Sequence, residues 1–275
     1  MGKLATISLL LGLSVGLVAQ KPQLYVGPTT NENIRWATKG DFDGSILFCR
    51  GYYTANRAEP NGDGWWTDYP GADHNFLVRL SELSLVRVRF DENRIPFYVT
   101  VKLDDPLLFK CPVLFMEDVG TMQLAQSEVE GLAKYLTSGG FLWVDDFWGN
   151  EAWDQWMDEL RRVLPSGLYP LIDVPKDHPI MTTLYKVDHI PQQPAIGLWN
   201  VDPDWPTSER GEESKDVHFR GVIDERDRLI VVMTHNTDIA DGWEEEKPEN
   251  QAYIQAFSAT SYAIGINIFI YALTH

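Results

Sequence analysis

The apolar positions of the chain form two patterns, short unbroken runs and stripes that repeat every three or four residues. Runs of strand length occur at 45–53, 86–90, 96–103, 112–117 and 141–145. Stripes typical of amphipathic helices occur at 72–84, 127–140 and 151–164. Because strands and helices alternate, and runs such as "PVLFM" have no polar face, the pattern predicts parallel strands covered by helices on both faces.

The second half of the chain follows a different pattern. Residues 188–217 are rich in proline and acidic side chains and have little periodicity, which indicates a long ordered loop or lid. Residues 218–235 predict a β-hairpin and 251–274 a long closing helix. We therefore expect a three-layer α/β fold with a mostly parallel sheet. It should form a single domain over 45–275, after a polar leader at 21–44.

The first twenty residues predict a secretory signal peptide. They contain one lysine, an uncharged apolar stretch from Leu4 to Val18 and a small residue at Ala19. We expect cleavage near Ala19 or Gln20, an exported protein that is secreted or periplasmic, and no stable membrane span afterwards. The alternative is a retained anchor, although the stretch is shorter than the roughly 20 residues that span a bilayer.

Charge and cysteine content narrow the classes of partner. Forty acidic against 23 basic residues give a net charge of -17, which repels phosphate backbones and excludes nucleic-acid binding. Divalent cations and neutral polar ligands suit such a surface. Cys49 falls late in one predicted strand and Cys111 at the start of another. In a parallel sheet they would lie at opposite ends, so we expect two buried free thiols rather than a disulfide.

The candidate site follows from the positions at which strands end. Ligands of parallel sheets bind outside the carboxyl ends of the strands, where the connecting loops gather. Polar residues follow four predicted strands there, among them Glu117-Asp118 after 112–117. The candidate ligand-binding residues are Asp68, Asp145, Asp146, His235, Asn236 and Asp238, with Trp66, Trp148 and Trp243 as walls.

Two chemistries suit this set of side chains. Carboxylates beside indole rings suit a sugar, whose rings stack while its hydroxyls donate hydrogen bonds. The same carboxylates with an imidazole could instead hold a divalent cation, with Asp145, His235 and Asp238 as candidate ligands. The alternative is that these residues have purely structural roles. Asp145 would then cap the next helix, Asp146 would be solvated and His235 would make its hydrogen bonds to nearby residues. The acidic stretch 243–250 is predicted to be a solvated loop.

Several stretches together resemble a bacterial family of exported or envelope proteins, domain-of-unknown-function family forty-one fifty-nine. They are "DYPGADHNFLVRLSELS", "LTSGGFLWVDDFWG", "DHPI", "VVMTHNTDIADGW" and the ending "YALTH", and the likeness covers nearly all of 45–275. The resemblance implies a flavodoxin-like, class I glutamine-amidotransferase-like sheet and no established activity. Amidotransferases need a cysteine at the turn after a central strand, but here that turn is Asp118-Val119-Gly120-Thr121. Thioester chemistry is therefore excluded.

Two functions remain open on the sequence. The sequence has no G-x-S-x-G, P-loop or dinucleotide motif and no Cys/His cluster with zinc spacing, so no nucleotide or flavin is expected. The first function is a non-catalytic module that binds a glycan-like polar ligand or an envelope protein. The alternative is a hydrolase, metal-assisted or with paired carboxylates. Because Asp145 and Asp146 point to opposite faces, the second carboxylate would come from Asp68, Glu117 or Asp238.

Overall fold

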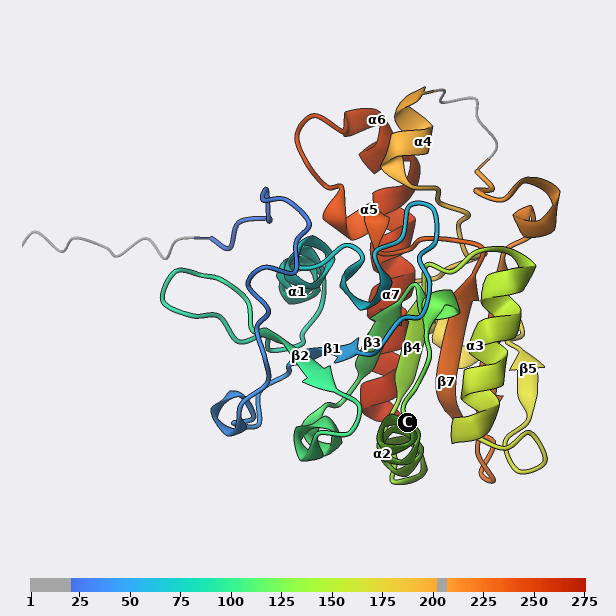
Figure 1. Ribbon diagram of the computed structural model, residues 1–275. Helices are drawn as coiled ribbons and strands as arrows, with labels where there is room; N and C mark the ends of the chain where they lie inside the picture. The colour runs from blue at the N-terminus through green and yellow to red at the C-terminus, as the bar shows by residue number, and fades with distance from the viewer. Residues whose placement is uncertain (1–20, 202–206) are drawn as a thin grey trace, which may run out of the picture.

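The computed structural model describes residues 21–201 and 207–275 and contains a seven-stranded sheet between two layers of helices (Figure 1). The strand order is β2-β1-β3-β4-β7-β6-β5. The strands are β1 (Phe48–Tyr52), β2 (Tyr98–Lys102), β3 (Leu114–Glu117), β4 (Leu142–Asp145), β5 (Leu171–Asp173), β6 (His218–Ile223) and β7 (Leu229–His235). The first five in the spatial order are parallel, while β6 and β5 are antiparallel additions. The predicted α/β architecture and hairpin are confirmed.

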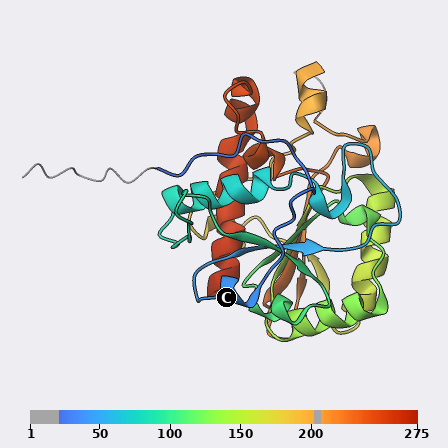
Figure 2. The ribbon, with the colours of Figure 1, turned by 60° about the vertical axis from the view of Figure 1, so that its left-hand side comes forward.

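The helices cover both faces of this sheet. They are α1 (Gly71–Leu83), α2 (Gln126–Thr137), α3 (Gly149–Val163), α4 (Ile196–Val201), α5 (Asp241–Glu244), α6 (Gln251–Tyr253) and α7 (Ala259–Thr274). Helices α1 and α7 pack on one face, whereas α2 and α3 pack on the other (Figure 2). Phe115 of β3 faces α1 and α7, and its neighbours Leu114 and Met116 face α2 and α3. Burial on both sides explains the unbroken apolar runs.

Residues 86–90 do not form the predicted strand, and the C-terminal helix begins before α7. Residues 86–90 make only the isolated bridges Ile46↔Val88 and Phe90↔Pro96. At the other end of the chain, α6, a π-helical turn at Ile254–Ser258 and α7 form one continuous helix. This helix is long and apolar enough to cross a membrane, but 61% of its most apolar window is buried in the fold, as in a core helix. The predicted signal peptide lies outside the described residues.

The prediction of two free thiols is wrong, because Cys49 and Cys111 form a disulfide with their Cα atoms 5.9 Å apart. Strand β1 begins at Phe48, three residues later than the apolar run suggests, so Cys49 is its second residue. Cys111 lies three residues before β3, which is the neighbour of β1. Both cysteines therefore lie at the amino-terminal ends of adjacent parallel strands.

We expect loss of this disulfide to destabilise the domain. The bond closes a chain segment of 62 residues, for which the loop-entropy relation gives a stabilisation of about 4 kcal/mol. Urea unfolding of the Cys49→Ala/Cys111→Ala variant should show that decrease in the free energy of unfolding. A reducing agent should lower the stability of the wild type and leave the double variant unchanged; equal sensitivity of the two proteins would contradict the assignment.

Candidate functional site

The carboxyl ends of β1, β3, β4 and β7 meet at one edge of the sheet, beside α5 (Figure 1). The chain leaves β1 for β2 on one side and β3 for β4 on the other, so the strand order reverses between β1 and β3. Open α/β sheets bind ligands at such a switch point. The polar residues expected at this edge are Glu117-Asp118 after β3, Asp145-Asp146 after β4 and His235-Asn236 after β7.

The strand register divides these residues between the two faces of the sheet. Glu117 pairs with Asp145 in the β3–β4 ladder, and both side chains point to the α1/α7 face. The Thr234 hydroxyl donates to Asp145 on that same face. Because successive side chains of a strand alternate, His235 points to the α3 face. The structure thus brings Asp145 and Glu117 together but not His235.

A buried guanidinium occupies the switch point. Arg50 of β1 is 0% exposed, and its Nε donates to the two carboxylate oxygens of Asp73 at 3.1 and 2.9 Å. Its Nη1 donates to Glu117 Oε2 and, at 2.9 Å, to the carbonyl of Thr67. Arg50 therefore connects β1 with α1, β3 and the loop that precedes α1.

Five buried carboxylates, one of them the Arg50 partner Glu117, lie close together at this edge. Asp68, Glu117 and Asp238 each offer an oxygen within 4.8 Å of the other two, and Asp68, Asp241 and Glu244 form a second such group. We call these five residues the acid cluster. Asp68 Oδ2 and Glu117 Oε1 are buried without a hydrogen-bond partner among the described residues. Glu117 is 0% exposed and the other four are 4–7% exposed, so the acid cluster lies just beneath the protein surface.

Burial makes these carboxyl groups weak acids. Burial raises the pKa of Glu117 to about 8, although Arg50 opposes that change. Burial, and then the neighbouring carboxylates, raise the pKa values of Asp68, Asp238 and Asp241 well above their usual range. Removing a carboxylate from water costs free energy unless a proton, a cation or hydrogen bonds compensate it. The acid cluster therefore favours bound positive charge.

Asp145 has a structural role that differs from the capping alternative. Besides the Thr234 contact, its Oδ2 accepts hydrogen bonds from the backbone amides of Ile239 at 2.8 Å and Ala240 at 3.1 Å. These bonds anchor the segment that carries Asp238 and leads into α5, not the start of α3. Burial raises the pKa of Asp145 to about 7, while these hydrogen bonds lower it. Asp145 positions the acid cluster rather than facing a ligand itself.

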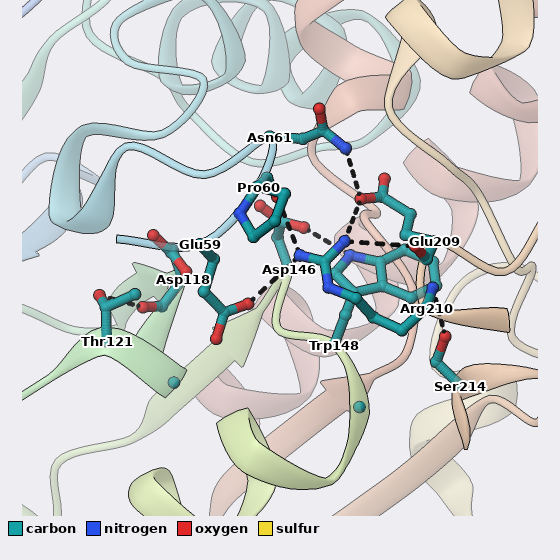
Figure 3. Close-up of polar contacts among 12 residues, drawn as sticks. Glu59, Pro60, Asn61, Asp118, Thr121, Asp146, Trp148, Glu209, Arg210 and Ser214 are labelled. Carbon is teal, nitrogen blue, oxygen red and sulfur yellow. Dashed lines mark hydrogen bonds and ion pairs between the residues drawn. The ribbon is translucent and has the colours of Figure 1, made fainter. Parts of the chain in front are cut away.

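Asp146 lies beside the acid cluster, under a segment that we call the strap, residues 207–214. Its Oδ1 accepts a hydrogen bond of 2.9 Å from Trp148 Nε1, and it is buried rather than solvated. Arg210 of the strap donates to the carbonyl of Pro60 at 2.8 Å and lies 3.6 Å from Glu59 (Figure 3). The strap is the part of the predicted 188–217 loop that covers this edge.

His235 and Asn236 hold the start of α3. His235 Nε2 lies 3.0 Å from the carbonyl of Gly149, and its ring stacks on Phe147 with centroids 4.7 Å apart. Burial lowers the pKa of His235 to about 3, which keeps the ring neutral at pH 7. Asn236 accepts from the Gly149 amide and donates to the Asp216 carbonyl, each at 2.8 Å. Neither side chain is a member of the acid cluster.

The three tryptophans predicted as walls pack into the protein. Trp243 is 0% exposed, and its ring centroid lies 4.6 Å from that of Phe76 and 5.4 Å from that of Trp143. Trp148 is buried over Asp146, and Trp66 is half-buried against the core of the α2/α3 face. Trp243 therefore offers no face on which a sugar ring could stack.

Arg50, Asp241 and Glu244 are not among the candidate residues predicted from the sequence. The prediction of a solvated loop at 243–250 is wrong at its start, because Trp243, Glu244 and Glu245 are buried. The spacing of Asp238, Asp241 and Glu244 was a usable signal, since residues three apart share one side of a helical turn. An arginine inside the apolar run "LFCRGY" was another, because a buried arginine requires carboxylate partners.

We expect Arg50→Met to destabilise the protein in a pH-dependent way. The variant leaves Asp73 and Glu117 without their shared cation, a change that costs about 3–5 kcal/mol when a buried pair is broken. Urea unfolding at pH 8 should show this loss. At pH 5 the loss should shrink because the carboxyl groups are protonated, whereas an equal loss at both pH values would show that packing alone is affected.

The raised pKa values predict that metal-free protein loses stability as the pH rises. A carboxyl group whose pKa is higher in the folded state stabilises the fold below its unfolded pKa, and this contribution disappears as the pH passes the folded pKa. For Glu117 the window runs from its ordinary pKa of 4.5 in the unfolded chain to its pKa of about 8 in the folded protein. Unfolding in EDTA across this window should show a shallower decline for Glu117→Gln than for the wild type. Parallel curves would contradict the prediction.

Comparison with known proteins identifies the family of this chain. Residues 55–273 match the model of the family described as domain of unknown function DUF4159. No curated protein matches the sequence. The match includes α1, β2 to β7, α5 and nearly all of α7, and therefore every member of the acid cluster. The chain thus belongs to the DUF4159 family of domains of unknown function.

Proposed function

We propose that this domain is an exported binding module that holds a divalent cation in the acid cluster. The observation that carries the proposal is the convergence of Asp68, Glu117 and Asp238 within 4.8 Å, with Asp68 Oδ2 and Glu117 Oε1 buried and unpartnered among the described residues. All-oxygen sets of this kind suit hard cations such as Ca²⁺, Mg²⁺ and Mn²⁺. The three carboxylates are the proposed ligands.

Two oxygens of the acid cluster are free to coordinate a cation. No donor among the described residues reaches Asp68 Oδ2 or Glu117 Oε1. Arg50 is already divided between Asp73 and Glu117. A divalent cation would satisfy the free oxygens and offset the excess charge together.

The bound cation would also supply the point at which a polar ligand attaches. Four of the five acid-cluster residues are 4–7% exposed, and we propose that a cation held there keeps a coordination position directed toward the surface. Hydroxyl or carboxylate oxygens of a glycan-like ligand can fill such a position. Recognition would then depend on coordination rather than on stacking against Trp243, which is buried. Extracellular calcium modules work with dissociation constants of about 10⁻⁴–10⁻³ M, a range suited to an exported protein.

Binding is favoured over the hydrolase alternative. Hydrolysis needs a general acid and base in reach of the reacting atoms. His235, the histidine among the candidate site residues, lies on the opposite face of the sheet, where its ring stacks on Phe147 and lies tilted against Trp153. Asp145 is engaged by Thr234 and two backbone amides. The geometry therefore supports a cation-dependent binding module.

Calorimetry on EDTA-treated protein tests this function. We expect Ca²⁺, Mg²⁺ or Mn²⁺ to bind the wild type and raise its melting temperature, because bound cations stabilise the ionised acid cluster. Asp68→Asn should weaken binding at least 100-fold. Asp177→Asn removes an exposed carboxylate and should change nothing. Failure of all three cations to bind the wild type would overturn the proposal and leave an envelope-protein partner as the better hypothesis.

A further inference from the structure

We infer that the acid cluster holds two divalent cations, bridged by Asp68. This inference rests on the proposed function. Asp68 is the residue common to both groups of converging carboxylates, with Glu117 and Asp238 in one and Asp241 and Glu244 in the other. A carboxylate has two oxygens and can bind a separate cation with each.

The separation of the oxygens suits one cation in each group. Ca²⁺–oxygen distances are about 2.3–2.6 Å, so ligands on opposite sides of the ion lie about 5 Å apart. In both groups the three oxygens lie within 4.8 Å of one another. Each group can therefore surround an ion without rearrangement of the backbone. Asp68 Oδ2, which has no partner among the described residues, is available to one of the two cations.

The second group is held in place by several contacts. Asp241 Oδ2 accepts hydrogen bonds from the Ile196 amide at 3.0 Å and the Tyr253 hydroxyl at 3.1 Å. The Thr29 hydroxyl donates to Glu244 Oε1. A Cβ atom at Gly71 would lie 2.6 Å from Glu244 Cγ, so the glycine leaves the space that Glu244 occupies. These contacts aim Asp241 and Glu244 at Asp68 before any ion is bound.

The two groups are also linked to each other. Asp238 Oδ1 of the first group accepts a hydrogen bond of 2.9 Å from the amide of Asp241 in the second. The excess of negative charge extends over both groups. Arg50 contacts two of the six carboxylates formed by the acid cluster and Asp73, namely Asp73 and Glu117. With all six ionised, and with Lys247 paired to Glu245 at 3.0 Å, one divalent cation leaves an excess of three negative charges, and a second reduces it to one. Two ions therefore fit the cluster better than one.

Metal stoichiometry tests this inference. EDTA-treated protein is titrated with Ca²⁺ and with Mn²⁺, and bound metal is counted by native mass spectrometry and calorimetry. We expect two ions per wild-type chain, one in Glu117→Gln, one in Glu244→Gln and none in Asp68→Asn. The remaining ion in each glutamine variant should bind within about tenfold of its wild-type affinity. Glu225→Gln, which alters an exposed glutamate, is the matched control and should keep two ions.

Electron paramagnetic resonance of the wild type gives a second measurement that does not depend on folding of a variant. Two Mn²⁺ ions bridged by one carboxylate should give a spin-coupled spectrum, whereas a single ion gives the uncoupled six-line signal. One ion per chain, lost in Glu117→Gln and kept in Glu244→Gln, would overturn the second cation and leave the proposed function intact. Absence of any bound ion would overturn both.

Discussion

The structure depends on how it compensates a buried excess of negative charge. Arg50, in the middle of β1, is the buried cation that contacts both Asp73 and Glu117. Buried ion pairs gain little net free energy, but removal of one partner is costly because a charge then remains unmatched in a medium that solvates it poorly. Arg50 thus fixes where α1 and β3 must lie, and the remaining carboxylates around Asp68 exceed what one guanidinium can neutralise. The divalent cation that we propose would offset this excess.

The same constraint explains why two adjacent aspartates end β4. Asp145 is the last residue of the strand and lies on the α1/α7 face. There its oxygens accept hydrogen bonds from the Thr234 hydroxyl and from the two backbone amides before α5. Asp146 follows with φ of 49°, in the left-handed region that aspartate and asparagine tolerate better than most residues. Asp118 after β3 and Asn236 after β7 have the same kind of conformation. The three neighbouring strands turn sharply at one edge. Glu117 and Asp145, before the first two turns, point to the α1/α7 face, whereas His235, before the third, points to the α3 face.

The sequence predicted the sheet, the hairpin, the closing helix and the edge at which acidic groups gather, because those features depend on local apolar patterns. The predictions were wrong where the position of a side chain depends on the exact start or register of a strand. A three-residue error in the start of β1 moved Cys49 to the wrong end of the strand and hid the disulfide. The face of His235 depends on its pairing with the β4 register, which no local pattern reveals. Glu244 lay in an acidic stretch, where a buried side chain cannot be distinguished from solvated neighbours by composition alone.

The disulfide and the buried ion pair are complementary parts of one arrangement. Strands β1 and β3 are paired in register only at Cys49↔Leu114 and Arg50↔Phe115, so their ladder is short at the point where the strand order reverses. Cys49 links β1 to the segment before β3 on the α2/α3 face, and the next residue, Arg50, links β1 to Glu117 on the α1/α7 face. The disulfide on one face of the sheet and the ion pair on the other thus hold β1 and β3 together. A rigid switch point keeps Glu117 in reach of Asp68, which is the arrangement that the proposed cation site requires.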